Sequence, residues 1–119
     1  MANKTLQTYL RTYRKRSNLS QDEIAYLVAL LFGTTVSRHE RSRRIPSLTD
    51  AFAYEALFGI PASKLFPGEY EKARARLEIR AHRLLKRLKQ GDKNSPVQKQ
   101  KIAFLEEFIR RVPAKSHTL

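Results

Sequence analysis

The chain has 119 residues, of which 24 are Lys or Arg and 11 are Asp or Glu, giving a formal net charge of +13 at pH 7. This length suits one small domain with an extension, and the 41% hydrophobic content is enough for a packed core. Cysteine is absent, which excludes disulfides, thiolate nucleophiles and cysteine-based zinc sites. Since no apolar run approaches the roughly 20 residues of a membrane span and no signal peptide is visible, we expect a soluble cytoplasmic protein.

The excess of positive charge favours a polyanionic partner, because each neutralised phosphate releases condensed counterions. Charge alone does not separate DNA, RNA and an anionic membrane surface. A basic protein without a polyanionic partner also stays open on this evidence.

Two helices are predicted before residue 29. The first carries an apolar stripe at helical spacing and ends near Ser17. The second begins at a capping box, in which Ser20 accepts from the amide of Glu23 and the Glu23 side chain reaches back to the Ser20 amide. The two stripes are Leu6, Tyr9, Leu10 and Tyr13, and then Ile24, Ala25, Leu27 and Val28.

A short turn and a third helix follow. Glycine can adopt the positive φ of a tight turn, so Gly33 is expected to close the turn. On the next helix, Val36 and Glu40 share one side, while the opposite arc of roughly 100° carries polar side chains. Arg can donate in bidentate fashion to guanine, and Ser or Thr can contact bases or phosphates, so this predicts a DNA recognition helix. The candidates for base reading are Thr34, Thr35, Ser37, Arg38 and Arg41.

Alternatives to base reading exist for these side chains. Thr34 and Thr35 could instead cap the start of the helix. Arg38 and Arg41 could belong to a solvated face on which they pair with nearby acids.

A fourth and a fifth helix are predicted between Pro46 and Pro67. Ser47 with Asp50 three residues later is a second capping signal, and Gly59 stands where a left-handed C-terminal cap belongs. The fifth helix lies within residues 60–66 and is closed by Pro67 and Gly68. The fourth carries the apolar residues Leu48, Phe52, Ala53, Ala56 and Leu57.

Residues about 6–66 resemble the XRE-like, phage-repressor type of helix-turn-helix domain, a five-helix DNA-binding unit. The matching segments are Leu10-Arg11…Arg14, Leu19-Ser20-Gln21-Asp22-Glu23-Ile24-Ala25, Val36-Ser37-Arg38-His39-Glu40-Arg41, Arg43-Arg44-Ile45-Pro46-Ser47-Leu48 and Leu57-Phe58-Gly59-Ile60-Pro61…Leu65-Phe66. The resemblance implies sequence-specific binding of double-stranded DNA, usually as a homodimer on a roughly palindromic operator. Transcriptional repression in a prokaryotic or phage context, at the nucleoid, is the commonest outcome.

The resemblance also implies roles for individual residues. Gln21 would contact a phosphate, and Arg14 would form a structural ion pair with Glu40. Arg43 and Arg44 are further candidates for phosphate contacts beside the groove. Because Leu30-Leu31-Phe32 intervene before Gly33, we expect the second helix to run longer than is usual in the family.

The fold prediction is all-α, with a five-helix domain over residues 1–68 and a two-helix extension over residues 69–119. The extension holds 14 Lys or Arg and 6 Asp or Glu, which accounts for +8 of the net charge of +13. A polar break at residues 90–94 separates its helices, and Ser95 and Pro96 open the second one. The candidates for a dimer interface are Leu77, Leu84, Leu88, Ile102, Leu105, Phe108 and Ile109.

Several roles stay open for the extension. It could dimerise, fold back on the first domain as additional core, contact phosphates, or lie on an anionic membrane. It could also bind a different protein through residues 96–113, as in an antitoxin or adaptor-type protein.

Neither a metal site nor catalysis is expected. His39, His82 and His117 lack the spacing of a shared metal site and are expected to be surface or half-buried residues. No nucleophile stands with a base and an orienting group, so we predict no enzyme activity and no cofactor.

Overall fold

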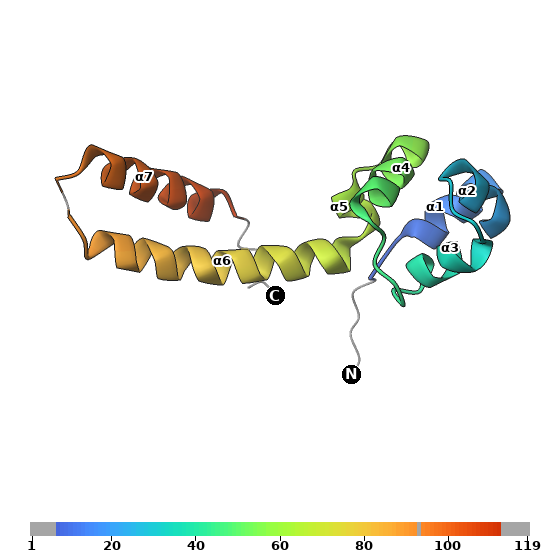
Figure 1. Cartoon of the computed structure of the whole chain (residues 1–119), viewed down its shortest axis with the longest axis horizontal. Helices are drawn as coiled ribbons and strands as arrows, with labels where there is room; N and C mark the ends of the chain where they lie inside the picture. Colours follow the sequence, from blue (N-terminus) through green and yellow to red (C-terminus); the bar gives the residue numbers. More distant parts are fainter. Residues whose placement is uncertain (1–6, 93, 113–119) are drawn as a thin grey trace. The chain divides into compact units, whose positions relative to one another are not determined.

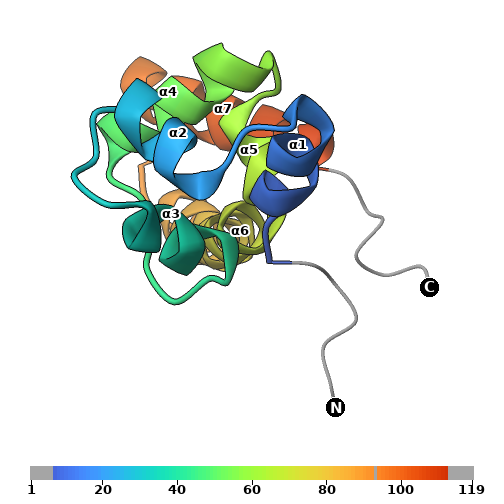
Figure 2. The same cartoon turned by 90° about the vertical axis from the view of Figure 1, so that its right-hand side faces the viewer.

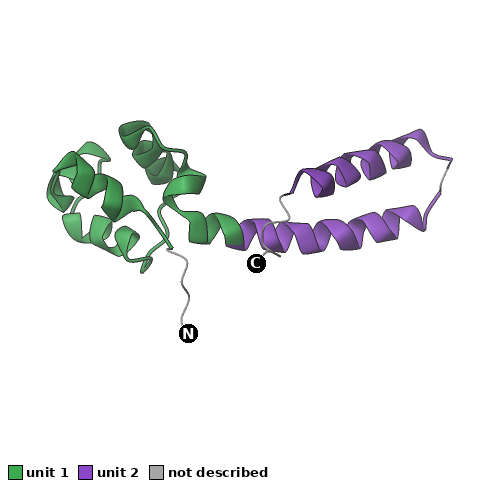
Figure 3. Ribbon diagram, turned by 180° about the vertical axis from the view of Figure 1, so that it is seen from behind, with its two compact units in different colours: residues 1–71 green, residues 72–119 purple. Residues whose placement is uncertain are grey.

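A computed structural model describes residues 7–92 and 94–112, and this part of the chain contains seven helices and no strand (Figure 1). The chain divides into two compact units, Met1–Glu71 and Lys72–Leu119 (Figure 3). None of the described helices combines the length and the apolar character needed to cross a membrane. The helices are α1 (Leu10–Ser17), α2 (Gln21–Leu27), α3 (Gly33–Glu40), α4 (Leu48–Phe58), α5 (Ala62–Leu65), α6 (Pro67–Lys89) and α7 (Pro96–Arg111).

Helix α1 begins later than its apolar stripe predicts. The amide of Tyr9 donates to the carbonyl of Leu65 at 2.7 Å, and the amide of Leu10 donates to Oγ1 of Thr8 at 2.9 Å. These contacts fix the segment before α1 in a non-helical conformation, so the helix starts at Leu10. Leu6, which the prediction included, lies outside the described residues.

Helix α2 has the predicted start but not the predicted length. Both hydrogen bonds of the capping box between Ser20 and Glu23 are present. The helix nevertheless ends at Leu27, so the expectation of a long second helix is wrong. The turn that follows places Ala29 in the left-handed region, with φ of 62°.

Gly33 is needed for close packing rather than for positive φ. It is the first residue of α3 and is not among the residues with positive φ. A Cβ atom at this position would lie 2.2 Å from Oδ1 of Asp22 and 3.0 Å from the Asp22 backbone nitrogen. Glycine therefore lets the start of α3 approach the first turn of α2.

The core of the first unit lies among α1–α5 and the residue that follows α5 (Figures 1 and 2). In α4, the predicted apolar stripe is largely on the surface, since Leu48 is 70% and Phe52 55% exposed. Tyr54 instead provides the buried anchor of this helix. The core consists of Leu10, Ile24, Ala25, Val28, Val36, Tyr54, Leu65 and Phe66.

Pro67 and Gly68 open α6 instead of closing α5. Proline suits the first position of a helix because an amide hydrogen at that position would have no partner within the helix, so its absence costs nothing. Gly68 donates its amide hydrogen to the carbonyl of Gln7 at 3.2 Å. The predicted end of the fifth helix is thus the start of a 23-residue helix.

In the second unit, α7 runs back along α6 (Figure 3). Ser95 caps α7 by accepting from the amide of Gln98, and the Gln98 side chain donates to the Leu88 carbonyl at 2.9 Å. Lys89 and Glu106 form an ion pair between the two helices, with 3.0 Å between Nζ and Oε2.

The second unit leaves much of its apolar surface uncovered. Among its described residues, Ala81 is the one buried side chain. Between α6 and α7 lies a groove of about 450 Å³. It is lined by Leu84, Leu88, Val97, Gln100, Lys101, Phe104 and Leu105.

Candidate functional site

Helix α3 has one face in the core and one in solvent. Val36 is completely buried, and His39 and Glu40 are 2% and 8% exposed. Thr34, Arg38 and the capping residue Arg41 are exposed. The helical period therefore separates the residues that hold α3 from those that it presents outward.

A buried ion pair fastens α3 to α1. Nε of Arg14 lies 2.5 Å from Oε2 of Glu40, and Nη2 of Arg14 donates to Oε1 at 3.2 Å. The Arg14 side chain is 12% exposed and that of Glu40 is 2% exposed. Nη1 of Arg14 also donates to the carbonyl of Leu19, which follows α1. The structure thus contains the Arg14–Glu40 pair that the resemblance implies.

Gln21 extends this cluster to α2. Its Nε2 atom donates to Oε1 of Glu40 at 3.0 Å. The Glu40 carboxylate therefore joins α1, α2 and α3 at one point. This structural contact was not predicted for Gln21, which is a candidate for a phosphate contact.

A second buried polar contact joins α3 to α4. Nδ1 of His39 and the hydroxyl oxygen of Tyr54 share a hydrogen bond of 2.8 Å, and the two rings meet edge to face. His39 is therefore neither a surface nor a half-buried residue, contrary to the prediction. His82 is exposed, and His117 lies outside the described residues.

Burial also changes the protonation of this pair. It lowers the pKa of His39, and the positive charge of Arg44 acts in the same direction, whereas Asp50 opposes the change. Burial raises the pKa of Tyr54 well above its ordinary value, with smaller contributions from Asp50 and Glu40. Burial therefore favours the neutral forms of both rings on the buried face of α3.

The start of α3 is held by Asp22. Its Oδ1 atom accepts from the amide of Gly33 at 3.2 Å. Phe32 at the N-cap position provides no side-chain hydrogen bond. Asp22 therefore supplies the cap from another helix, and Thr34 is exposed and takes no part in it.

Four arginines are exposed on and just after α3: Arg38, Arg41, Arg43 and Arg44. None of them forms an ion pair with an acidic residue in the described ranges 7–92 and 94–112. The amide of Arg43 donates to the carbonyl of Arg38 at 2.8 Å, which closes the end of the helix. The result is a local excess of positive charge beside short polar side chains.

The other predicted site residues are less exposed. Thr35 and Ser37 on α3, and Gln21 on α2, are half-buried. The predicted dimer candidates all lie in the second unit, where Leu77 is 54% exposed and the others are half-buried.

Three residues of the site were missed from the sequence: Asp22, His39 as a core residue, and Tyr54. Asp22 and Gly33 are 11 residues apart, and His39 and Tyr54 are 15 apart, so neither contact follows from helical spacing. The position of His39 three residues after Val36 was a usable signal, because it places the ring on the buried side of α3.

The described residues contain no group of three side chains suited to holding a metal ion. Comparison of the chain with protein-family models, with curated proteins and with solved structures finds no match.

Proposed function

We propose that the chain is a sequence-specific, double-stranded DNA-binding transcriptional regulator of the XRE-like type, with a five-helix helix-turn-helix domain formed by α1–α5. The observation that carries this proposal is the division of α3 into two faces. Arg38 and Arg41 lie in solvent without an acidic partner in the described chain, while Val36, His39 and Glu40 hold the opposite face.

In the proposed mechanism, α3 enters the major groove. Arg38 and Arg41 donate to base edges, guanine being the preferred partner of arginine, and Thr34, Thr35 and Ser37 supply shorter contacts. Because Glu40 is tied to α1 and α2, the angle of α3 relative to those helices is fixed before binding. The protein then loses little conformational freedom when the complex forms.

Phosphate contacts would fix the register on the duplex. Arg43 and Arg44 follow α3 directly and are fully available for this role. Gln21 can take part without leaving Glu40, because its side-chain amide carries two protons and the structure uses one.

We further propose that two copies associate through the apolar groove of the second unit. Two helices alone bury only part of their apolar surface, and Val97 and Phe104 on the groove are 57% and 69% exposed. A homodimer would present two copies of α3 to half-sites about 10–10.5 base pairs apart or a multiple of that spacing. Occupation of promoter DNA would then repress transcription.

Selection of bound sequences from a random duplex library tests this proposal. We expect one enriched motif with twofold symmetry and the half-site spacing given above. A library in which no sequence is enriched after repeated rounds would contradict sequence-specific binding. Enrichment of a single asymmetric half-site would contradict the dimer.

The same groove also supports a second candidate function. A chain whose groove receives a different protein would act as an antitoxin or adaptor-type DNA-associated protein. Light scattering on the isolated chain separates the candidates: a dimer supports the regulator, whereas a monomer that binds DNA only with a second polypeptide supports the adaptor.

A further inference from the structure

The α6 segment in the second unit carries a row of arginines on one side. At about 100° per residue, Arg76, Arg80, Arg83 and Arg87 fall within an arc of roughly 60°. All four are exposed. We call them the arginine stripe; it extends about 16 Å along the helix axis at 1.5 Å per residue.

The charges of the arginine stripe are not used within the described chain. Ion pairs in the described part of this unit include Arg74–Glu78, Lys89–Glu106 and Arg110–Glu107. No member of the stripe forms an ion pair within residues 7–92 and 94–112. Glu78 lies about 200° from Arg76 around the helix, on the opposite side. Four like charges on one arc repel one another, so the stripe costs folding free energy unless a partner neutralises it.

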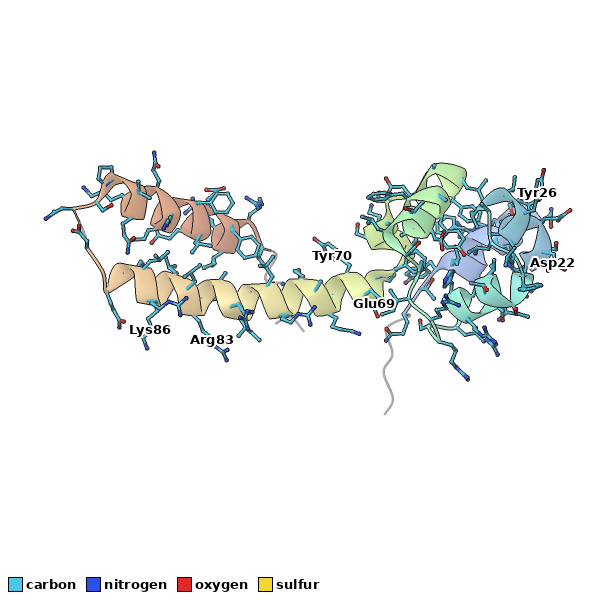
Figure 4. All side chains as sticks on the ribbon, in the orientation of Figure 1. Asp22, Tyr26, Glu69, Tyr70, Arg83 and Lys86 are labelled. Carbon is cyan, nitrogen blue, oxygen red and sulfur yellow. The ribbon has the colours of Figure 1, made fainter. Side chains whose placement is uncertain are left out.

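The stripe also lies apart from the apolar face that meets α7. Leu84 and Leu88 line the groove and are centred about 90° away from the stripe. Figure 4 shows Arg83 and its neighbour Lys86 pointing away from α7. Packing of the hairpin, or filling of the groove by a second copy, therefore leaves the stripe accessible.

We infer that the arginine stripe binds the phosphate backbone of duplex DNA without reading its sequence, as a second contact surface in addition to α3. This inference rests on the proposed function, because it assigns the extra affinity to the same DNA. Arginine suits the role, since its planar guanidinium donates two parallel hydrogen bonds to one phosphate. Over 16 Å of axis a duplex carries about ten phosphate charges, which is ample for four arginines.

An anionic membrane is the less favoured partner. Helices that lie on a bilayer insert an apolar face beside their cations. Here Leu84 and Leu88 face the groove, and the large exposed apolar residues that flank the stripe are Ile79 on one side and Leu77 on the other, each 54% exposed. Two separate side chains offer little area for insertion.

The test compares the unaltered full chain with two variants of equal net charge. The stripe variant replaces Arg76, Arg80, Arg83 and Arg87 with Gln, and the control variant replaces Lys15, Lys64, Lys99 and Arg111, all exposed and outside both the stripe and the groove, with Gln. Each loses four positive charges, from +13 to +9. Helicity by circular dichroism equal to that of the unaltered chain, together with a cooperative thermal transition, establishes that each variant folds.

Binding is measured on a short random-sequence duplex and on the selected operator, between about 50 and 200 mM salt. For the stripe variant we expect the slope of log K against log salt to fall by about 2 to 4, and the control variant to change it by less than about 1. The preference for the operator over the random duplex should be unchanged, because phosphate contacts carry no sequence information.

Each other outcome overturns one identifiable statement. Equal slopes for the two variants would overturn the arginine stripe and leave the proposed function standing. If the unaltered chain bound neither duplex, the proposed function would fall, and this inference with it. If the stripe variant lost binding to phosphatidylserine vesicles and kept its DNA slope, the stripe would be a membrane contact.

Discussion

Single polar residues beneath α3 decide how firmly that helix is held. The carboxylate of Glu40 accepts hydrogen bonds from Arg14 and Gln21. The ring of His39 shares a hydrogen bond with the hydroxyl group of Tyr54. Every buried side-chain nitrogen and oxygen in the described chain has a hydrogen-bond partner. Loss of one partner therefore leaves a buried polar group unsatisfied, which costs more than the bond itself contributed.

Glu40→Gln is expected to destabilise the fold by about 3 kcal/mol, because Arg14 would keep a buried charge without its counter-ion. Urea unfolding measures the loss. Glu107→Gln is the matched control: it removes an exposed pair with Arg110 and should cost less than about 1 kcal/mol. Equal losses for the two variants would show that the Arg14–Glu40 pair contributes no more than a surface pair.

The pKa of His39 predicts how stability depends on pH. Since burial lowers this pKa in the folded state, the unfolded chain binds the proton more readily below about pH 6.5. The free energy of unfolding should be largest above that pH, fall as the pH drops through it, and stop falling below the folded pKa. Urea unfolding between about pH 8 and pH 5 measures this dependence.

The control for this pH dependence is a second histidine. His39→Gln should abolish the decline, whereas His82→Gln, at an exposed position of α6, should keep it. If the free energy of unfolding of the His39→Gln variant still fell as the pH dropped, groups other than His39 would be responsible for the pH dependence.

At the scale of the element, the sequence predicts which residues of α3 lie on its buried and exposed faces. It does not predict the conformation of the turn that leads into this helix. The helical period places Val36 and Glu40 opposite Arg38, and the structure has this arrangement. The positive φ lies at Ala29, which no residue-type preference indicates, because alanine rarely adopts it. Tyr54 was likewise missed because the apolar stripe of α4 pointed to Leu48 and Phe52, which core packing leaves on the surface.

Gly33→Ala is expected to destabilise the fold by about 1–3 kcal/mol, because the new methyl group would push the start of α3 away from α2. Thermal unfolding measures the change. At Gly91, a methyl group first meets the side-chain amide of Gln98, which can turn aside, so Gly91→Ala should have a smaller effect. A Gly33→Ala protein as stable as the original would refute the close approach.

Arg38→Ala should cost about 1–3 kcal/mol in binding to the selected operator and relax specificity at one base pair. Arg43→Ala should weaken all sequences alike and reduce the salt slope by about 1. Titrations of operator and random duplex distinguish the two effects. Equal losses on both duplexes for Arg38→Ala would count against base reading by this side chain.

For the whole molecule, the extent of the family resemblance predicts a domain boundary after residue 68, and the division between the two compact units falls between residues 71 and 72. The apolar stripes of α6 and α7 were also visible in the sequence. The apolar area that α6 and α7 bury against each other depends on the distance between the two helices. The spacing of apolar residues along the sequence does not specify that distance. The groove of about 450 Å³ therefore does not follow from the sequence pattern.

The proposed dimer predicts the effect of removing apolar side chains from the groove. Val97→Ser with Phe104→Ser should shift the chain from dimer to monomer in sedimentation equilibrium, because both side chains are exposed and hold little of the hairpin itself. Leu31→Ser, in the first unit at a side chain 90% exposed, is the control and should leave the dimer intact. A double variant that sediments as a dimer would rule out this groove as the interface.

In α3 the residues that anchor the helix are separate from those exposed to solvent, and this separation has a practical consequence for the redesign of binding specificity. Thr34, Arg38 and Arg41 make no side-chain hydrogen bond or ion pair with the rest of the described chain, whereas Val36, His39 and Glu40 anchor the helix. Randomising the three outward positions should therefore yield a library whose members nearly all fold. A single scaffold can then be screened for new target preferences without a stabilising mutation for each.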